Sequence, residues 1–148
     1  MKVHWNPFEW GDPGPRIKVV IRHTEDEIRL GVGLDYPEPV AVMALMALLD
    51  TGAQTTIIHS ALATSRKLTM TDANVPARGI GGQCFCDEYA CSISFPNSDL
   101  PGIGTTRVLA REFKELHHVV LIGRDIMRTW KMDFDPRAKS VIITPYAS

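Results

Sequence analysis

The 148 residues are enough for one ordinary domain with its own hydrophobic core. A hydrophobic content of 45% and a charged content of 22% are typical of a folded globular protein and exclude a disordered or fibrous one. Lys and Arg number 16 against 17 Asp and Glu, and the net charge of -1 provides no basic field for a nucleic acid or an anionic membrane. Neither is therefore expected as a partner.

The apolar runs and the cysteines predict a cytoplasmic protein. The N-terminal segment lacks an apolar core of signal-peptide length, and the longest apolar run, 39–49, is about half of the roughly 20 residues that a membrane-spanning helix needs. The 3 cysteines are an odd count, and Cys84 and Cys86 are too close in sequence for an easy mutual bridge. This argues against a secreted disulfide framework and for a reducing compartment.

Taken in chain order, the predicted elements are mostly strands. Residues 1–15 mix aromatic residues with Pro and Gly, which predicts either a loose arm or a strap packed on the domain or on a partner. Strands are predicted at 17–22, 28–34, 40–49, 55–58, 89–95, 105–113 and 118–123, and 132–143 as a closing hairpin. Helical turns are predicted at 59–68, with His59 or Ser60 near the cap, and at 124–132. Turns or loops are predicted at 23–27, 35–39, 75–83 and 97–104. The sum favours a small β barrel or sandwich-like domain.

One stretch, ALLDTGAQTTII at 47–58, contains an Asp-Thr-Gly turn between two apolar runs. Gly52 permits a backbone conformation closed to other residues, so that the carboxylate of Asp50 can project from the turn. The simpler interpretation is an Asx turn that closes a hairpin, with Asp50 bonded to backbone N–H groups two residues on. A surface turn rarely has apolar runs on both sides, so the flanking ALL and II argue against this simpler interpretation.

Two further stretches stand out. RGIGGQ at 78–83 predicts a hairpin tip whose backbone can approach a ligand closely. It is not a phosphate-binding loop, because no Lys-Ser/Thr follows the glycines. The alternative is a plain tight turn. VVLIGRDIM at 119–127 predicts an apolar strand that leaves the core at Gly123, for which the simplest role of Asp125 is a helix N-cap.

Together, and in this order, the three stretches resemble the retroviral-type aspartic proteases (retropepsins). ALLDTGA is similar to the family's active-site turn, GIGG to its flap tip and LIGRDIM to its strand–helix passage. The resemblance covers roughly 28–143, so we expect a protease domain over 28–148, preceded by an arm and an extra strand over 1–27. It implies a mainly β, small closed-barrel domain with one or two short helices that acts as a homodimer.

The resemblance also implies an aspartic endopeptidase that acts on polypeptides without a metal or other cofactor. A single Asp-Thr-Gly in this length means that the second carboxylate comes from Asp50 of a second copy. Water would be activated between the two carboxylates. The implied site residues are Asp50 as the catalytic group, Thr51, Gly52 and Ala53 as active-site support, and Gly79, Ile80, Gly81, Gly82, Val119 and Leu121 as substrate-binding positions.

The chain departs from the family pattern at Gln54 and at its C-terminal strand. Gln54 stands where many viral members carry an acid that pairs with the Arg matching Arg124, which here would bond Gln54, Asp125 or another chain. The C-terminal VIITPYAS adds a strand that compact viral members lack, so we expect a differently built interface sheet.

The main rival function is a non-catalytic dimerisation or peptide-binding module of the same fold. A zinc site of the three cysteines with His117 or His118 has poor ligand spacing and is set below buried apolar roles for the thiols.

Overall fold

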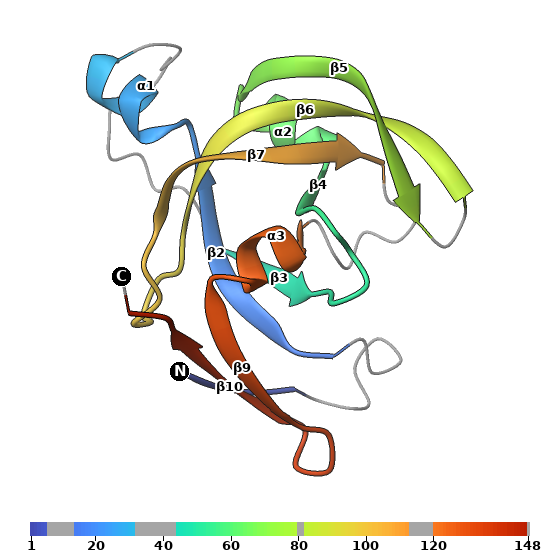
Figure 1. Cartoon of the computed structure of the whole chain (residues 1–148). Helices are drawn as coiled ribbons and strands as arrows, with labels where there is room; N and C mark the ends of the chain where they lie inside the picture. Colours follow the sequence, from blue (N-terminus) through green and yellow to red (C-terminus); the bar gives the residue numbers. More distant parts are fainter. Residues whose placement is uncertain (6–13, 32–43, 80–81, 113–119, 148) are drawn as a thin grey trace.

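The computed structural model describes residues 1–5, 14–31, 44–79, 82–112 and 120–147, and its strands close into a barrel (Figure 1). Around the barrel the hydrogen-bonded order is β2-β3-β8-β4-β7-β6, and β6 returns to pair with β2. The strands are β1 (Lys2–His4), β2 (Arg16–Arg22), β3 (Leu45–Leu49), β4 (Ile57–His59), β5 (Thr69–Gly79), β6 (Gly82–Ser94), β7 (Ile103–Arg111), β8 (Val120–Ile122), β9 (Trp130–Asp135) and β10 (Ser140–Pro145). The prediction of a mainly β, closed-barrel fold is confirmed.

The order β3-β8-β4 in the sheet positions the Asp-Thr-Gly turn. β3 runs parallel to β8, with Leu49 opposite Ile122, while β4 runs antiparallel to β8, with Ile57 opposite Leu121. β8 therefore lies between the two strands that the turn at residues 50–56 connects. The turn must pass over the end of β8, which places Asp50 next to the segment that leaves β8.

The core sits inside the barrel and continues under the second sheet, β1-β10-β9. Ile21, Ile58 and Ile122 are fully buried in the barrel strands, and Val141 and Ile143 of β10 are equally buried. β10 alternates buried and exposed residues over 141–144, as expected for a strand with one face on the core. The N-terminal strand β1 pairs with β10, so residues 2–4 belong to this second sheet.

The charged segment after β2 forms a helix, α1 (Glu25–Leu30), and corrects two predictions. A turn was expected at 23–27 and a strand at 28–34, but Thr24 and Glu27 form a capping box and Gly31 ends the helix in the left-handed region at φ 69. These local signals outweigh the short alternating pattern. Residues 32–43 lie outside the described part of the chain, including the predicted turn at 35–39.

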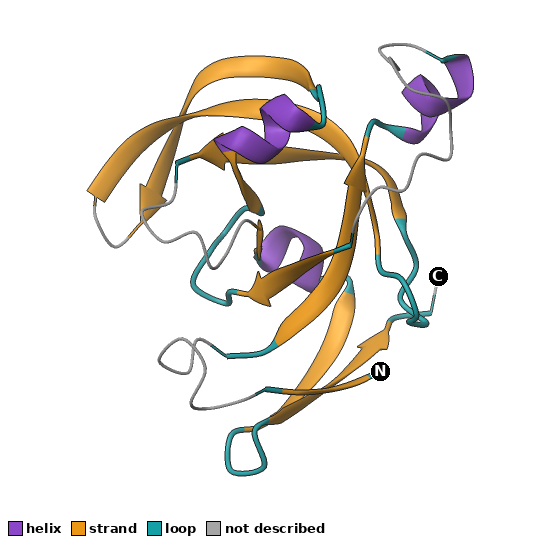
Figure 2. Cartoon of the chain, turned by 180° about the vertical axis from the view of Figure 1, so that it is seen from behind, coloured by secondary structure: helices purple, strands orange, loops and turns teal. Residues whose placement is uncertain are grey.

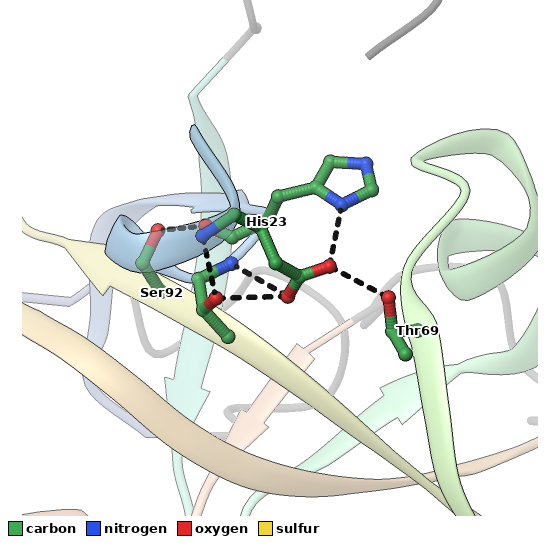
Figure 3. Close-up of polar contacts among 5 residues, drawn as sticks. His23, Thr69 and Ser92 are labelled. Atoms are coloured by element: carbon green, nitrogen blue, oxygen red, sulfur yellow. Dashed lines mark hydrogen bonds and ion pairs between the residues drawn. The ribbon is translucent and has the colours of Figure 1, made fainter. Parts of the chain in front are cut away.

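A polar cluster fastens α1 to the barrel. Figure 3 shows His23, Thr69 and Ser92 around it. The Glu27 carboxylate accepts hydrogen bonds from the Thr69 hydroxyl at 2.6 Å and from the Thr24 hydroxyl at 2.8 Å. Ser92 donates to the backbone carbonyl of His23 at 2.7 Å. α1 is thereby tied to the start of β5 and to β6, although none of its own residues is buried.

The other two helices follow the prediction in part. α2 (Ser60–Ser65) begins after His59, whose Nδ1 accepts from the Ala61 N–H at 3.0 Å, which confirms the predicted cap. α3 (Arg124–Met127) is a single turn and not the predicted two, because the chain resumes a strand at Trp130. Its N-cap residue is Gly123 and not Asp125. No helix within the described residues has the length and apolar character needed to span a bilayer.

The strands β5 and β6 form a long hairpin that projects from the barrel (Figure 1, green and yellow). The predicted glycine-dense turn at 75–83 is in fact paired strand up to Gly79 and again from Gly82, which face each other in register. Only residues 80–81 remain between them, and they lie outside the described residues. In Figure 2, which shows the molecule from behind, this hairpin arches over one end of the barrel.

Candidate active site

The Asp50 carboxylate lies in a tight turn that starts where β3 ends. The Asp50 N–H donates to the Ile122 carbonyl at 2.9 Å, and the Ala53 N–H returns to the Asp50 carbonyl at 3.1 Å. The Gly52 N–H donates to Asp50 Oδ1 at 2.9 Å. The Asx bond of the simpler interpretation is therefore present, but the turn closes no hairpin, because β8 lies between β3 and β4. The Asp50 side chain is half-buried, with Oδ1 fixed in place.

Gly52 has no positive φ, so the special backbone conformation predicted for it is not observed, and glycine is favoured here by a close approach to the Asp50 side chain. A Cβ at this position would lie 3.1 Å from Asp50 Oδ1, so a side chain would press on the carboxylate that the turn holds. Thr51 and Gly52 are exposed, and Ala53 is half-buried. The turn therefore presents its outer edge, with the Asp50 side chain, to a surface that nothing in the described part of the chain covers.

The segment that follows β8 supports the turn from the other side. The backbone N–H of Arg124 donates to the Ala53 carbonyl at 2.9 Å, and that of Asp125 donates to the Gln54 carbonyl at 3.1 Å. The Arg124 guanidinium donates through Nη1 to the Thr51 carbonyl at 2.8 Å. Within this chain Arg124 thus bonds the backbone of the turn and neither Gln54 nor the Asp125 side chain, which corrects two of the three alternatives above.

A partly buried network behind the turn joins Thr56, Asp125 and Gly123. The Thr56 N–H lies 3.0 Å from both carboxylate oxygens of Asp125, and its hydroxyl donates to Asp125 Oδ1 at 2.8 Å. The same hydroxyl accepts the Gly123 N–H at 3.0 Å. Thr56 is fully buried. Sequence reasoning missed this residue, although a threonine inside the apolar run after the turn could have indicated a buried hydroxyl with partners.

Gly123 is needed where the two loops touch. A Cβ there would lie 2.6 Å from the carbonyl carbon of Thr55 and 2.9 Å from the Thr56 nitrogen. These are backbone atoms that cannot swing aside. Glycine at this position allows the loop after β8 to pack directly on the loop that carries Asp50.

The structure describes some of the other predicted site residues. Leu121 is half-buried on β8 between its register partners Leu48 and Ile57, close in the sheet to the end of β3. Gly79 and Gly82 form the last pair of the β5–β6 hairpin, with Gly82 at φ 99, a conformation that favours glycine. In Figure 1 the hairpin tip and the end of β3 both point to the right-hand side of the barrel. Ile80, Gly81 and Val119 lie outside the described residues.

The three thiols lie on β6. Cys84 and Cys86 have their sulfur atoms 3.9 Å apart, and all three cysteines are free. Among the described residues no group of three or more His, Cys, Asp and Glu side chains could hold a metal ion. His117 and His118, the partners weighed for zinc, are not among those residues.

Comparison with known proteins agrees with this fold. The family model for retroviral aspartyl proteases matches residues 13–135. The structure is similar to that of the EIAV protease complexed with the inhibitor HBY-793, at 22% identity over 84% of this chain and 91% of that one, with a TM-score of 0.54. It is also similar to a retropepsin-like aspartic protease from Rickettsia conorii, at 13% identity over 97% of this chain and 88% of that one, with a TM-score of 0.55. A search of curated protein sequences gave no match. The chain belongs to the retroviral aspartyl protease family.

Proposed function

We propose that this chain is an aspartic endopeptidase whose active site forms between two copies, each contributing Asp50. The observation that carries the proposal is the Asp50 turn itself. One carboxylate oxygen is fixed by the Gly52 N–H, and the turn is fastened from behind by Arg124. Its outer edge, at Thr51 and Gly52, remains exposed. A rigid turn with an open edge is suited to meet its own symmetry mate across a two-fold axis.

The chemistry follows from bringing two carboxylates together. At about 3 Å two carboxylates cannot both be ionised, so they share one proton. The ionised member then acts as general base on a water molecule, and the protonated member donates a hydrogen bond to the scissile carbonyl. As the water attacks, the proton passes through the pair to the leaving amine. The role of the protein is to hold both carboxylates rigidly.

The substrate proposed is an extended polypeptide with apolar side chains at the cleavage site. The β5–β6 hairpin would cover the peptide, with Gly79 and Gly82 permitting close backbone approach at its tip. The half-buried Leu121 on β8 would contribute to an apolar pocket wall near the end of β3.

The replacement Asp50→Asn tests the proposal because it preserves the shape of the turn and removes the charge. We expect wild-type protein to cleave a casein-like substrate at mildly acidic pH, pepstatin to inhibit the cleavage, and Asp50→Asn to abolish it while keeping the wild-type melting temperature. Asp133→Asn, at an exposed carboxylate on β9, is the matched control and should retain activity. Cleavage that persists in Asp50→Asn would refute the mechanism. A folded dimer that binds peptides but never cleaves them would instead establish the rival, a binding module.

A further inference from the structure

Two thiols face each other on the projecting hairpin. Cys84 and Cys86 are separated by one residue on β6, and because strand side chains alternate between faces, both point to the same side. Their sulfur atoms are 3.9 Å apart. Phe85, between them, points to the opposite face and is 66% exposed. Cys86 is buried and Cys84 is half-buried, so Cys84 is the thiol that solvent can reach.

A guanidinium lies beside the accessible thiol. Arg111 Nη1 is 3.9 Å from Cys84 Sγ. The pairing of β7 with β6 extends only to Ala110 opposite Asp87, so the β6 segment that carries Cys84 runs past the paired part of β7. The Arg111 side chain bridges this step. A positive charge beside a sulfur stabilises the negative charge on it when it attacks an electrophile.

The remaining thiols are less reactive. Burial raises the pKa of Cys91 to about 12, with the nearby Glu27 charge adding to the effect. Burial and the hydrogen bond with Cys84 raise the pKa of Cys86 to about 11. Neither thiol is exposed enough to be the first point of attack. The arrangement therefore pairs one accessible thiol near a cation with one protonated neighbour behind it.

We propose that Cys84 is a site of reversible modification by low-molecular-weight disulfides such as glutathione disulfide, with Cys86 as the resolving thiol. In the first step the Cys84 sulfur attacks one sulfur of glutathione disulfide. The glutathione S–S bond breaks, a Cys84–glutathione disulfide forms, and one glutathione leaves with the proton that Cys84 gives up. In the second step Cys86 attacks the Cys84 sulfur, releases the second glutathione with the proton of Cys86, and closes a Cys84–Cys86 bond.

The strand geometry makes the closed form easy to reduce. On an extended strand, the Cα atoms of residues i and i+2, such as Cys84 and Cys86, are about 6.6 to 6.8 Å apart. This is at the upper end of the range that a disulfide spans, about 4.4 to 6.8 Å, so the bond would form under strain. Strained disulfides have more oxidising potentials and are reduced readily, which suits a reversible modification.

The modification would act on the hairpin. A glutathionyl group on Cys84 would occupy the space between β6 and Arg111, close to the tip that ends at Gly79 and Gly82. This consequence rests on the proposed function: in a peptidase whose hairpin closes over the substrate, an adduct near its tip lowers the rate of cleavage. Dithiothreitol should restore the rate.

The test is mass spectrometry of native protein incubated with an excess of glutathione disulfide at neutral pH. We expect wild type to pass through a single glutathionyl adduct on Cys84 to an intrachain Cys84–Cys86 disulfide, and Cys86→Ser to stop at the adduct. Cys84→Ser should acquire neither, and Cys91→Ser should behave as wild type. Arg111→Gln should slow the first step several-fold, while the matched replacement Arg107→Gln, at an exposed arginine on the same strand, should not.

Wild-type protein that stays unmodified under these conditions would overturn the proposal, as would a Cys84→Ser variant modified at the wild-type rate. Equal rates in Arg111→Gln and Arg107→Gln would remove the assigned role of Arg111. Because adduct formation is read by mass, its outcome does not depend on proteolysis. An adduct that forms on a chain without peptidase activity would refute the proposed function and leave the thiol site standing.

Discussion

The Asp125 carboxylate accepts two kinds of hydrogen bond from Thr56, one from its backbone N–H and one from its hydroxyl. The two residues are 69 positions apart in the chain. Their contact joins the loop that carries Asp50 to the turn after β8, and the Thr56 hydroxyl extends it by accepting the Gly123 N–H. The position of the Asp50 turn therefore depends on a partly buried side-chain network as well as on β3.

Replacing Thr56 by Val tests this network, because valine has nearly the same shape but no hydroxyl. The change leaves the Gly123 N–H without its acceptor and removes one donor from Asp125. An unsatisfied buried polar group costs about 1 to 3 kcal/mol. We expect the free energy of unfolding, measured by urea denaturation, to fall by that amount, and peptidase activity to fall further than stability explains.

The control for this experiment is Thr105→Val on β7, where the threonine is exposed. It makes the same chemical change at the surface and should leave stability within experimental error of wild type. If Thr56→Val proved as stable and as active as Thr105→Val, the network would have no structural role.

Gly123 gives a second prediction, about the contact between the two loops. An added Cβ in Gly123→Ala would meet the Thr55 carbonyl carbon at 2.6 Å, so the backbone must shift. Overpacking of this kind costs about 1 to 3 kcal/mol. Gly102→Ala is the matched control, since its Cβ would have its nearest neighbour at 3.4 Å. Thermal melting should show a clear loss for the first variant and little for the second; equal melting temperatures would contradict the packing described.

The sequence predicted those parts of the fold whose signals are local and apolar. β2, β3 and β8 are short apolar runs, and the hairpin β9–β10 closes around its turn residues as expected. α1 was missed because none of its residues is buried, so it has no apolar periodicity; only the Thr24–Glu27 capping box marked it. β5 was missed altogether for a similar reason, since most of the strand is exposed and lacks alternation.

In the candidate site, too, the local features were predicted from the sequence and the contacts between distant segments were not. Asp50 and Gly52 were identified from a short motif whose turn geometry is local. The bond from Arg124 to the Thr51 carbonyl and the network of Thr56 with Asp125 join segments far apart in the chain. These contacts depend on how the loops pack at the ends of the neighbouring strands β3, β8 and β4. No single stretch of sequence specifies that packing.

The polar cluster of Figure 3 predicts how stability depends on pH. Burial raises the pKa of Glu27, but hydrogen bonds from Thr69, Thr24 and His23 lower it more, so the pKa lies below its ordinary value. A carboxyl group whose pKa is lower in the folded state stabilises the fold fully above its unfolded-state pKa. That contribution is lost as the pH falls through the folded-state pKa.

Glu27→Gln should therefore lower the melting temperature most near about pH 7, and the difference from wild type should shrink toward about pH 3. Glutamine still fits a capping box, so the variant tests the charge and not the cap. Glu25→Gln removes an exposed carboxylate from the same helical turn without touching the cluster, so comparing the two variants isolates the effect of the Glu27 contacts. A Glu27→Gln difference that stayed constant with pH would show that the cluster does not hold an ionised carboxylate.

The central claim, that one active site needs Asp50 from two chains, is tested most directly by mixing wild-type protein with Asp50→Asn. The two proteins are equilibrated so that subunits exchange, at constant total concentration and increasing fraction of the variant, and the rate of peptide cleavage is measured. Because only dimers with two intact carboxylates would be active, we predict that the rate falls as the square of the wild-type fraction. A rate that falls in direct proportion to the wild-type fraction would show that each chain acts alone and would contradict the shared site.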